Sequence, residues 1–200
     1  LKLLEHPDPY VRFDAWYRVD KLLNYGILTL DEVKEEKKYF LELLESNDER
    51  IRYNAWDTVK GLLDKGLVEL EDLIQRKMYF LNLLESKNHG IRYNVRYDVK
   101  DLIEKGILTK DDAGFVLKLL EHPDPYVRFD AWDLATDLLY MRIITLEEVR
   151  KRRQYFAELY EMDLDFPDPK QWSAMERVYM TLSVMGALSS GDEESHDSSG

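Results

Sequence analysis

Few of the side chains that enzymes use for catalysis are grouped together in this sequence. The chain has four histidines and no cysteine, so it offers neither thiolate chemistry nor a disulfide framework. His6 and His122 occupy the same place in two identical segments, and duplication accounts for them better than chemistry does. The sequence contains no His-Glu-x-x-His motif, no phosphate-binding glycine loop and no nucleophile elbow. We therefore expect no catalytic residue, no cofactor and no metal in a protein that is not an enzyme.

A different set of recurring residues suits binding: aromatic side chains interleaved with charges. Large amphipathic rings give contact area for little lost side-chain freedom, which favours them at protein-binding surfaces. We predict that a partner contacts Tyr10, Phe13, Tyr17, Arg50, Tyr53, Tyr93, Tyr97, Tyr126 and Phe129. The alternative is that these rings pack between neighbouring helices and do not reach a partner.

Repetition of the chain positions these aromatics. The segment LKLLEHPDPYVRFDAW at 1–16 returns unchanged at 117–132, and two diverged copies begin at Leu41 and Leu81. The units near 1–40, 41–80, 81–116 and 117–156 thus have periods of 40, 40 and 36 residues. Such periods, with two helical segments per unit, are typical of α-solenoids. We predict an all-α, right-handed solenoid (an α-α superhelix) of about four and a half helical hairpins.

The predicted solenoid is a single domain over 1–188, and its last part, 157–188, is a divergent cap. In that cap, Met175, Met180 and Met185 are expected to fill the core, with a soft docking patch as the alternative. Residues 189–200 lack apolar side chains and are predicted to form a disordered acidic tail. Because Leu1 falls in the last turn of an expected helix, we expect the chain to be a fragment.

Each unit is predicted to contain a helix A, a tight turn and a helix B. Helix A of the second layer should run from about Leu30 to Glu45, starting at a capping box formed by Thr29 and Glu32. Helix B should run for about sixteen residues and end in a left-handed glycine, at Gly26, Gly66 and Gly106. Arg142 replaces the fourth glycine, which should lower stability unless that helix end is built differently. The expected helix B N-caps are Asp8, Asp48, Asn88 and Asp124.

One face of helix B is apolar and its two edges are polar. Leu3, Leu4, Val11 and Ala15 are predicted to lie in the core, as are Trp16, Trp56 and Trp132. Arginines flank the apolar stripe on one side and amides or carboxylates on the other: Arg12, Arg52, Arg92 and Arg128 against Asp14, Asn54, Asn94 and Asp130. Stacking would bring these edges together, so we predict a polar ladder between layers. The alternative is pairing within a unit at i−4, as between Arg12 and Asp8.

The pattern of Asp, then Val-Arg or Ile-Arg, then Ala, in DPYVRFDA at 8–15 and DERIRYNA at 48–55, resembles the HEAT repeat, and the resemblance extends over about 1–156. It implies a non-catalytic scaffold or adaptor whose B helices line a concave protein-binding surface. It also implies structural roles for Asp8, Arg12, Asp48, Arg52, Arg92, Asp124 and Arg128, whereas Asn88 departs from the pattern. Some HEAT-like solenoids are DNA glycosylases and others are lyases or lyase subunits, which gives two alternative functions.

Charge narrows the choice of partner. The net charge of −12 produces a field that repels phosphate backbones, so a nucleic-acid partner is not expected. The basic run from Arg150 to Arg153 is interpreted as a solvated helix surface. No stretch approaches the roughly 18 apolar residues of a membrane span. We expect a cytoplasmic monomer that binds another protein or a peptide and no membrane.

Overall fold

The computed structural model describes all residues except 163, 165–168 and 190–200, and the side chains of 169–172 are also left undescribed. Every regular element within the described part is a helix, which confirms the predicted all-α class. None of these helices is long and apolar enough to cross a membrane. The chain forms two compact units, Leu1–Thr109 (unit 1) and Lys110–Gly200 (unit 2), and each is described by itself. The boundary falls within the shortened third period.

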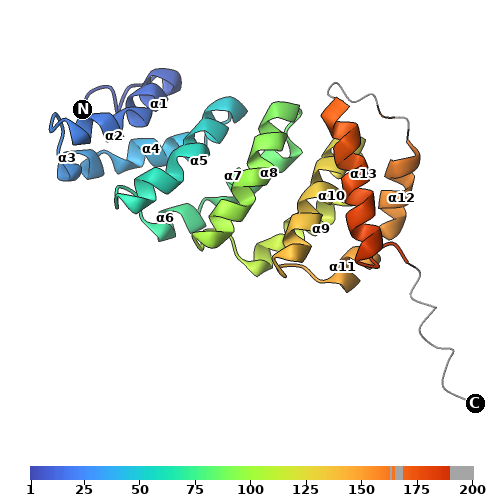
Figure 1. Cartoon of the computed structure of the whole chain (residues 1–200). Helices are drawn as coiled ribbons and strands as arrows, with labels where there is room; N and C mark the ends of the chain where they lie inside the picture. Colours follow the sequence, from blue (N-terminus) through green and yellow to red (C-terminus); the bar gives the residue numbers. More distant parts are fainter. Residues whose placement is uncertain (163, 165–168, 190–200) are drawn as a thin grey trace, which may run out of the picture. The chain divides into compact units, whose positions relative to one another are not determined.

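Unit 1 consists of three helical layers (Figure 1). Layer 1 contains α1 (Pro9–Tyr17) and α2 (Val19–Asn24). Layer 2 contains α3 (Leu30–Glu35), α4 (Lys37–Leu44) and α5 (Glu49–Asp64), and layer 3 contains α6 (Leu70–Ile74), α7 (Lys77–Leu81), η1 (Asn82–Glu85) and α8 (His89–Glu104). The B helices α1, α5 and α8 follow one another, because α5 contacts both α1 and α8, while α4 packs against α5 and η1 against α8.

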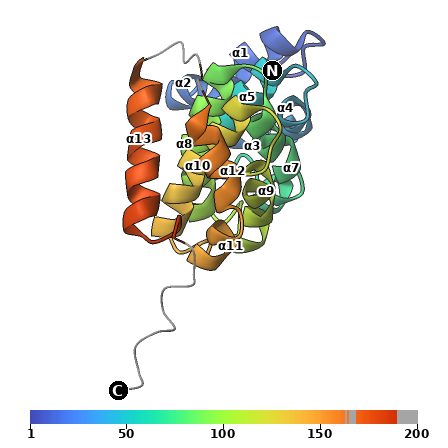
Figure 2. The same cartoon turned by 90° about the vertical axis from the view of Figure 1, so that its right-hand side faces the viewer.

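Unit 2 repeats the hairpin and ends in the last long helix (Figure 2). It contains η2 (Lys110–Asp112), α9 (Ala113–Leu119), α10 (Pro125–Tyr140), α11 (Leu146–Arg150), α12 (Arg153–Glu161) and α13 (Pro169–Val184). Helix α10 is the centre of this unit, because α9, α12 and α13 all pack against it.

Helix A is broken in two, which corrects the expectation of one continuous helix from Leu30 to Glu45. The break falls at Glu36, and equivalent breaks separate α6 from α7 and α11 from α12. Arginine side chains compensate in two of these places, since Arg76 Nη1 donates to the Asp72 carbonyl and Arg152 Nη1 to the Glu148 carbonyl, both at 2.9 Å. A break frees carbonyls from the helical ladder, and a guanidinium four residues on can satisfy one of them.

The predicted starts of helix B are confirmed. Side chains at the four N-cap positions accept from backbone N–H groups of the first turn: Asp8, Asp48, Asn88 and Asp124. Helices α5, α8 and α10 each have sixteen residues, whereas helix B of layer 1 is interrupted at Arg18. Behind each cap a further acceptor holds the cap's own N–H, and these acceptors are His6 Nδ1, Ser46 Oγ, Ser86 Oγ and His122 Nδ1. His6 and His122 therefore have a structural role, because each stabilises the turn that precedes helix B.

The ends of helix B share one geometry despite the replaced glycine. Gly26, Gly66 and Gly106 have φ of 66°, 66° and 75°, and Arg142 adopts the same left-handed region with φ of 58°. At each end the next residue's N–H bonds to a carbonyl five residues back, as Ile143 does to Leu138 at 2.9 Å. Because a side chain raises the energy of this conformation, Arg142 carries the expected strain.

An aromatic pair recurs in the core. Trp16, Trp56 and Trp132 are buried, as predicted, and each indole N–H donates to a backbone carbonyl 12 residues earlier, at 3.1 to 3.2 Å. Each ring packs on the phenylalanine that follows it by 24 positions, with centroids 5.1 to 5.4 Å apart. The third copy changes both members of this pair, to Arg96 and Val116.

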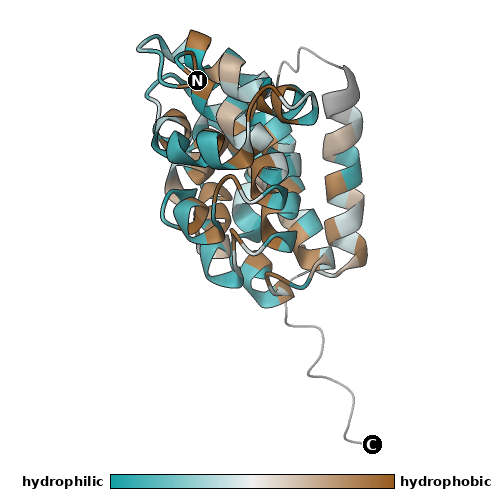
Figure 3. Ribbon diagram, turned by 90° about the vertical axis from the view of Figure 1, so that its left-hand side faces the viewer, coloured by the Kyte–Doolittle hydropathy of each residue, from teal (hydrophilic) through white to brown (hydrophobic). Residues whose placement is uncertain are grey.

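Layer 1 leaves one apolar face open, which corrects the core assignment of two residues. Leu3 is exposed and Val11 is 37% exposed, whereas Ile51, which holds the equivalent position in layer 2, is 1% exposed. Within unit 1, layer 2 has a layer on either side, while layer 1 packs against layer 2. Figure 3 looks onto this end, where hydrophobic and hydrophilic segments alternate. Leu4 is buried as predicted.

For Arg12 and Arg52, the partners differ from those of the predicted ladder. Arg12 pairs with Glu42 of layer 2 at 3.1 Å, while Asp14 pairs with Arg18 of its own helix at 3.0 Å. Arg52 and Arg92 donate to the backbone carbonyls of Ser46 and Ser86, at 2.5 and 2.7 Å, across the turn between helices A and B. In unit 2, Arg128 lies 4.0 Å from Glu158, and Asp130 is buried.

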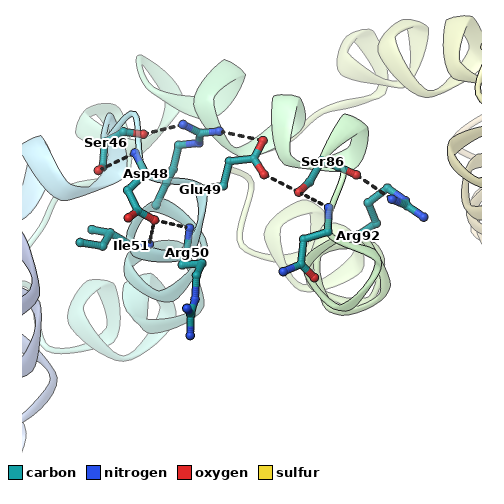
Figure 4. A network of polar contacts seen from close by, with 9 residues as sticks. Ser46, Asp48, Glu49, Arg50, Ile51, Ser86 and Arg92 are labelled. Carbon is teal, nitrogen blue, oxygen red and sulfur yellow. Dashed lines mark hydrogen bonds and ion pairs between the residues drawn. The ribbon is translucent and has the colours of Figure 1, made fainter.

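Arg52 and Arg92 thus brace the turns of their hairpins, while Arg12 links layer 1 to layer 2. Other side chains also link neighbouring layers. Glu49 accepts from the Ser86 hydroxyl at 2.5 Å and lies 3.9 Å from Arg52, so it joins layers 2 and 3 (Figure 4). Further links are Lys65 with Asp20, Lys105 with Asp64, and Lys60 with Asp101.

The C-terminal predictions are tested in part. Met175 is buried in α13, which agrees with a capping core, but Met180 is 60% exposed. The predicted disordered tail, 189–200, lies outside the described residues apart from Ser189, whose hydroxyl donates to the Gly186 carbonyl.

Candidate partner-binding surface

The outward faces of α5 and α8 carry aromatic and charged side chains close together. At about 100° per residue, Tyr93, Tyr97 and Asp101 lie within about 80° of arc on α8, opposite the buried stripe. Tyr53, Asp57 and Lys60 occupy the corresponding arc of α5. We call the combined set the α5–α8 surface: Tyr53, Asp57, Lys60, Tyr93, Asn94, Arg96, Tyr97, Asp98 and Asp101.

A cation and two tyrosines form one side of this surface. The Arg96 guanidinium carbon lies 5.2 Å from the Tyr93 ring centroid and 4.7 Å from that of Tyr97. Arg96 Nη2 also donates to the Tyr97 hydroxyl at 2.8 Å, and that hydroxyl donates to the Tyr93 hydroxyl at 3.3 Å. Arg96 is only 5% exposed while both tyrosines remain open to solvent. The replacement of tryptophan by arginine therefore fixes two rings in place through cation–π contacts.

Carboxylates gather on the side of α8 that faces α5. Burial, together with the nearby charges of Asp57 and Asp101, raises the pKa of Asp98 to about 7, and Lys60 only partly opposes this shift. Asp98 Oδ2 is buried without a hydrogen-bond partner among the described residues. Lys60 is already paired with Asp101. This part of the surface thus holds more negative charge than its own cations neutralise.

Tyr53 borders the carboxylates and is partly buried. Burial and the charges of Asp57 and Asp98 raise the pKa of Tyr53 to about 12, and a hydrogen bond with Asn94 acts in the opposite direction. The ring therefore stays a neutral phenol, and its bond with Asn94 joins α5 to α8.

The predicted contact residues are placed unequally. Five are exposed: Tyr10, Tyr17, Arg50, Tyr93 and Tyr97. Three are partly buried: Phe13, Tyr53 and Tyr126. Phe129 is only 2% exposed, so its assignment to partner contact was wrong. The sequence pattern could not reveal this difference, because Phe13 and Phe129 lie in identical segments.

Tyr10 has a second role that the sequence did not suggest. Its hydroxyl donates to Asp48 Oδ2 at 2.6 Å and so ties layer 1 to the N-cap of α5. This hydrogen bond lowers the pKa of Asp48 and raises that of Tyr10. The ring edge is still exposed, but the hydroxyl is no longer free for a partner.

Sequence reasoning missed the three carboxylates of the α5–α8 surface. Asp98 and Asp101 are spaced i, i+3 on α8, which was a readable signal that they share a face. Their proximity to Asp57 depends on the pairing of α5 with α8, which no local pattern specifies. Within the described residues no group of three or more histidines and carboxylates could hold a metal ion.

Comparisons with protein-family models, with curated proteins and with solved structures gave no match. The resemblance to HEAT repeats therefore remains a prediction.

Proposed function

We propose that this chain is a non-catalytic helical-repeat scaffold, a HEAT-like right-handed α-solenoid, that binds a protein or peptide on the outward faces of its B helices. The observation that carries the proposal is the exposed α5–α8 surface, where Arg96 holds Tyr93 and Tyr97 in position. Pre-oriented tyrosines beside charges give contact area with little loss of rotamer freedom, as protein-binding surfaces require.

The charge of this surface favours a partner segment with basic residues. Asp98 lacks a full complement of hydrogen bonds, and Asp57 and Asp101 lie close enough to raise its pKa. An arginine or lysine of the partner, paired with the exposed Asp57, would reduce the repulsion between these carboxylates and stabilise the ionised form of Asp98. The same carboxylates would repel a phosphate backbone, so a nucleic-acid partner and a DNA glycosylase role are disfavoured.

Quantitative partner capture tests this proposal, using variants at exposed or partly buried positions. We expect Tyr93→Ala with Tyr97→Ala, and separately Asp57→Asn with Asp98→Asn, to reduce the captured partner at least about tenfold, as losing central contacts does. Tyr140→Ala in unit 2 is the matched control, because Tyr140 is also exposed and lies outside the surface. Undiminished capture by folded variants would contradict the proposed surface.

Binding of labelled duplex DNA at two salt concentrations distinguishes the protein-binding scaffold from a nucleic-acid-binding solenoid. If the chain is a protein-binding scaffold, DNA should bind weakly at both concentrations. Tight binding that falls steeply with salt would mean that several phosphates are neutralised by the protein, and the scaffold proposal would then give way to a nucleic-acid-binding solenoid.

A further inference from the structure

The last hairpin of unit 2, formed by α11, α12 and α13, differs from the earlier repeats at three core positions. Leu41, Leu81 and Leu117 are buried, but the equivalent residue is Ala157, which is exposed. Leu44, Leu84 and Leu120 are buried, but their equivalent, Tyr160, is 43% exposed. Val19, Val59, Val99 and Ala135 are buried, but the equivalent in α13 is Tyr179, which is 38% exposed. One side chain has become smaller and two have become aromatic.

These three residues line a cavity of about 490 Å³ between α11, α12 and α13. The loss of the leucine side chain at Ala157 leaves space, and the two tyrosines form a wall beside it. Their rings stack with centroids 4.7 Å apart and planes 22° apart. The Phe156 ring centroid lies 6.1 Å from that of Tyr160, with the ring planes 30° apart, and 6.5 Å from that of Tyr179, with the planes 19° apart. The three aromatic rings thus form one stacked cluster on this side of the cavity.

Cationic side chains also line the cavity. Arg150 and Arg153 line it, and among the described residues no carboxylate pairs with either of them. Arg150 Nε donates to the Gly186 carbonyl at 2.8 Å, and a Cβ added at Gly186 would lie 3.1 Å from Arg150 Nη2. The guanidinium is thus held against the loop after α13. Arg153 donates to the Arg150 carbonyl at 3.3 Å and is otherwise exposed.

We propose that this cavity is a binding site for a small anion that contains both an aromatic ring and a phosphate or carboxylate group, about the size of a nucleoside monophosphate. The ring would stack beside Tyr160 and Tyr179, because aromatic faces prefer offset-stacked partners. The anion would lie against Arg150 and Arg153, whose planar donors match phosphate and carboxylate oxygens. The volume lies within the range of small-molecule pockets. Glu161 at the rim can accept from a ring N–H or a ligand hydroxyl.

Isothermal titration of the full chain with AMP, adenosine and inorganic phosphate tests the site. AMP is expected to bind at least about tenfold more tightly than either fragment, because only AMP uses both halves of the cavity. Arg153→Gln and Tyr179→Leu should each weaken AMP binding at least about fivefold. Leucine keeps apolar bulk but has no ring face.

Two controls keep the result interpretable. Lys118→Gln removes one positive charge from an exposed position in α9, outside the cavity, and should leave AMP affinity within about twofold. Arg153→Gln changes an exposed side chain, so it remains informative if Tyr179→Leu unfolds. The Tyr93→Ala with Tyr97→Ala variant should bind AMP normally, since this site does not depend on the proposed function of unit 1. Absent AMP binding at millimolar concentration, or affinity unaffected by both cavity variants, would overturn the proposal.

Discussion

At the scale of single residues, the same amino acid behaves differently according to its neighbours. Asp101 is neutralised by Lys60, whereas Asp98, one turn earlier, is partly buried among like charges and has a pKa raised to about 7. Tyrosines show a similar division, since Tyr97 presents an open ring held by Arg96 while Tyr53 is partly buried beside Asn94. Residue type and helical spacing identify the candidates, and burial selects among them.

The raised pKa of Asp98 predicts a pH-dependent stability. Folding raises this pKa above the unfolded value of about 4, so the folded state binds the proton more tightly. The free energy of unfolding should therefore fall as pH rises from about 4 to about 7 and then level off. Asp98→Asn removes this ionisation and should stabilise the protein by about 1 kcal/mol at pH 8, with a smaller gain near pH 5.

Urea unfolding at the two pH values measures this effect. Asp111→Asn is the control, because Asp111 is an exposed carboxylate outside the α5–α8 surface. An equal gain from Asp98→Asn at pH 5 and pH 8 would mean that Asp98 is not strained by its ionisation.

At the scale of elements, the two ends of helix B keep the same geometry from copy to copy although the residues that form them change. Four N-caps have the same geometry although two are preceded by histidine and two by serine at the supporting position. Four of the left-handed ends are glycine, and one is Arg142. The hairpin geometry is thus imposed by packing strongly enough to hold one unfavourable residue.

Arg142→Gly should relieve the strain at the end of α10. We expect the free energy of unfolding to rise by about 0.5 to 1 kcal/mol, since glycine reaches this conformation without a Cβ penalty although it loses more backbone entropy on folding. The reciprocal change, Gly106→Ala at φ of 75°, should lower it by a similar amount. Thermal unfolding of both variants measures these changes in stability. A lower stability of Arg142→Gly would show that the arginine side chain supports the turn.

His122→Ser should be nearly neutral, because serine performs the same task behind Asp48 and Asn88. His122→Ala removes the acceptor for the Asp124 N–H and should cost about 1 kcal/mol, as loss of a capping hydrogen bond does. Chemical unfolding of both variants compares them directly. Equal losses would indicate that the imidazole packing matters more than its acceptor.

At the scale of the whole molecule, unit 1 has an open apolar end at layer 1, where Leu3, Val11 and Ile27 are exposed. The equivalents of Val11 and Ile27 in layer 2, Ile51 and Leu67, are buried. In stacked arrays stability is close to a sum of layer and interface contributions. A layer added to this end should therefore raise stability.

Inserting a second copy of residues 41–80 directly before Leu1 tests that expectation. The new junction, Phe80 to Leu1, repeats the natural steps from Phe40 to Leu41 and from Phe80 to Leu81. We expect the thermal midpoint to rise by at least about 5 °C, since roughly 1 kcal/mol shifts it by about 2–4 °C in a chain of this length. An insert of the same composition in scrambled order is the control. An unchanged midpoint would show that the end face does not accept a layer.

The proposed solenoid also predicts an elongated particle. A compact chain of this length has a radius of gyration of about 16 Å, and small-angle scattering of residues 1–189 should give a clearly larger value. A value at the compact limit would exclude the solenoid while leaving the all-α fold intact.

The sequence alone determined the N-caps of helix B, its left-handed glycine ends and the buried tryptophans, because each depends on spacing or on backbone chemistry within one unit. It did not determine which copies of a motif are exposed. Val11 and Val127 lie in identical segments, yet Val11 is exposed and Val127 is buried. Tertiary structure also decided the partners of the arginines, the breaks in helix A and the gathering of Asp57, Asp98 and Asp101. These features depend on contacts between elements distant in sequence, which local periodicity does not specify.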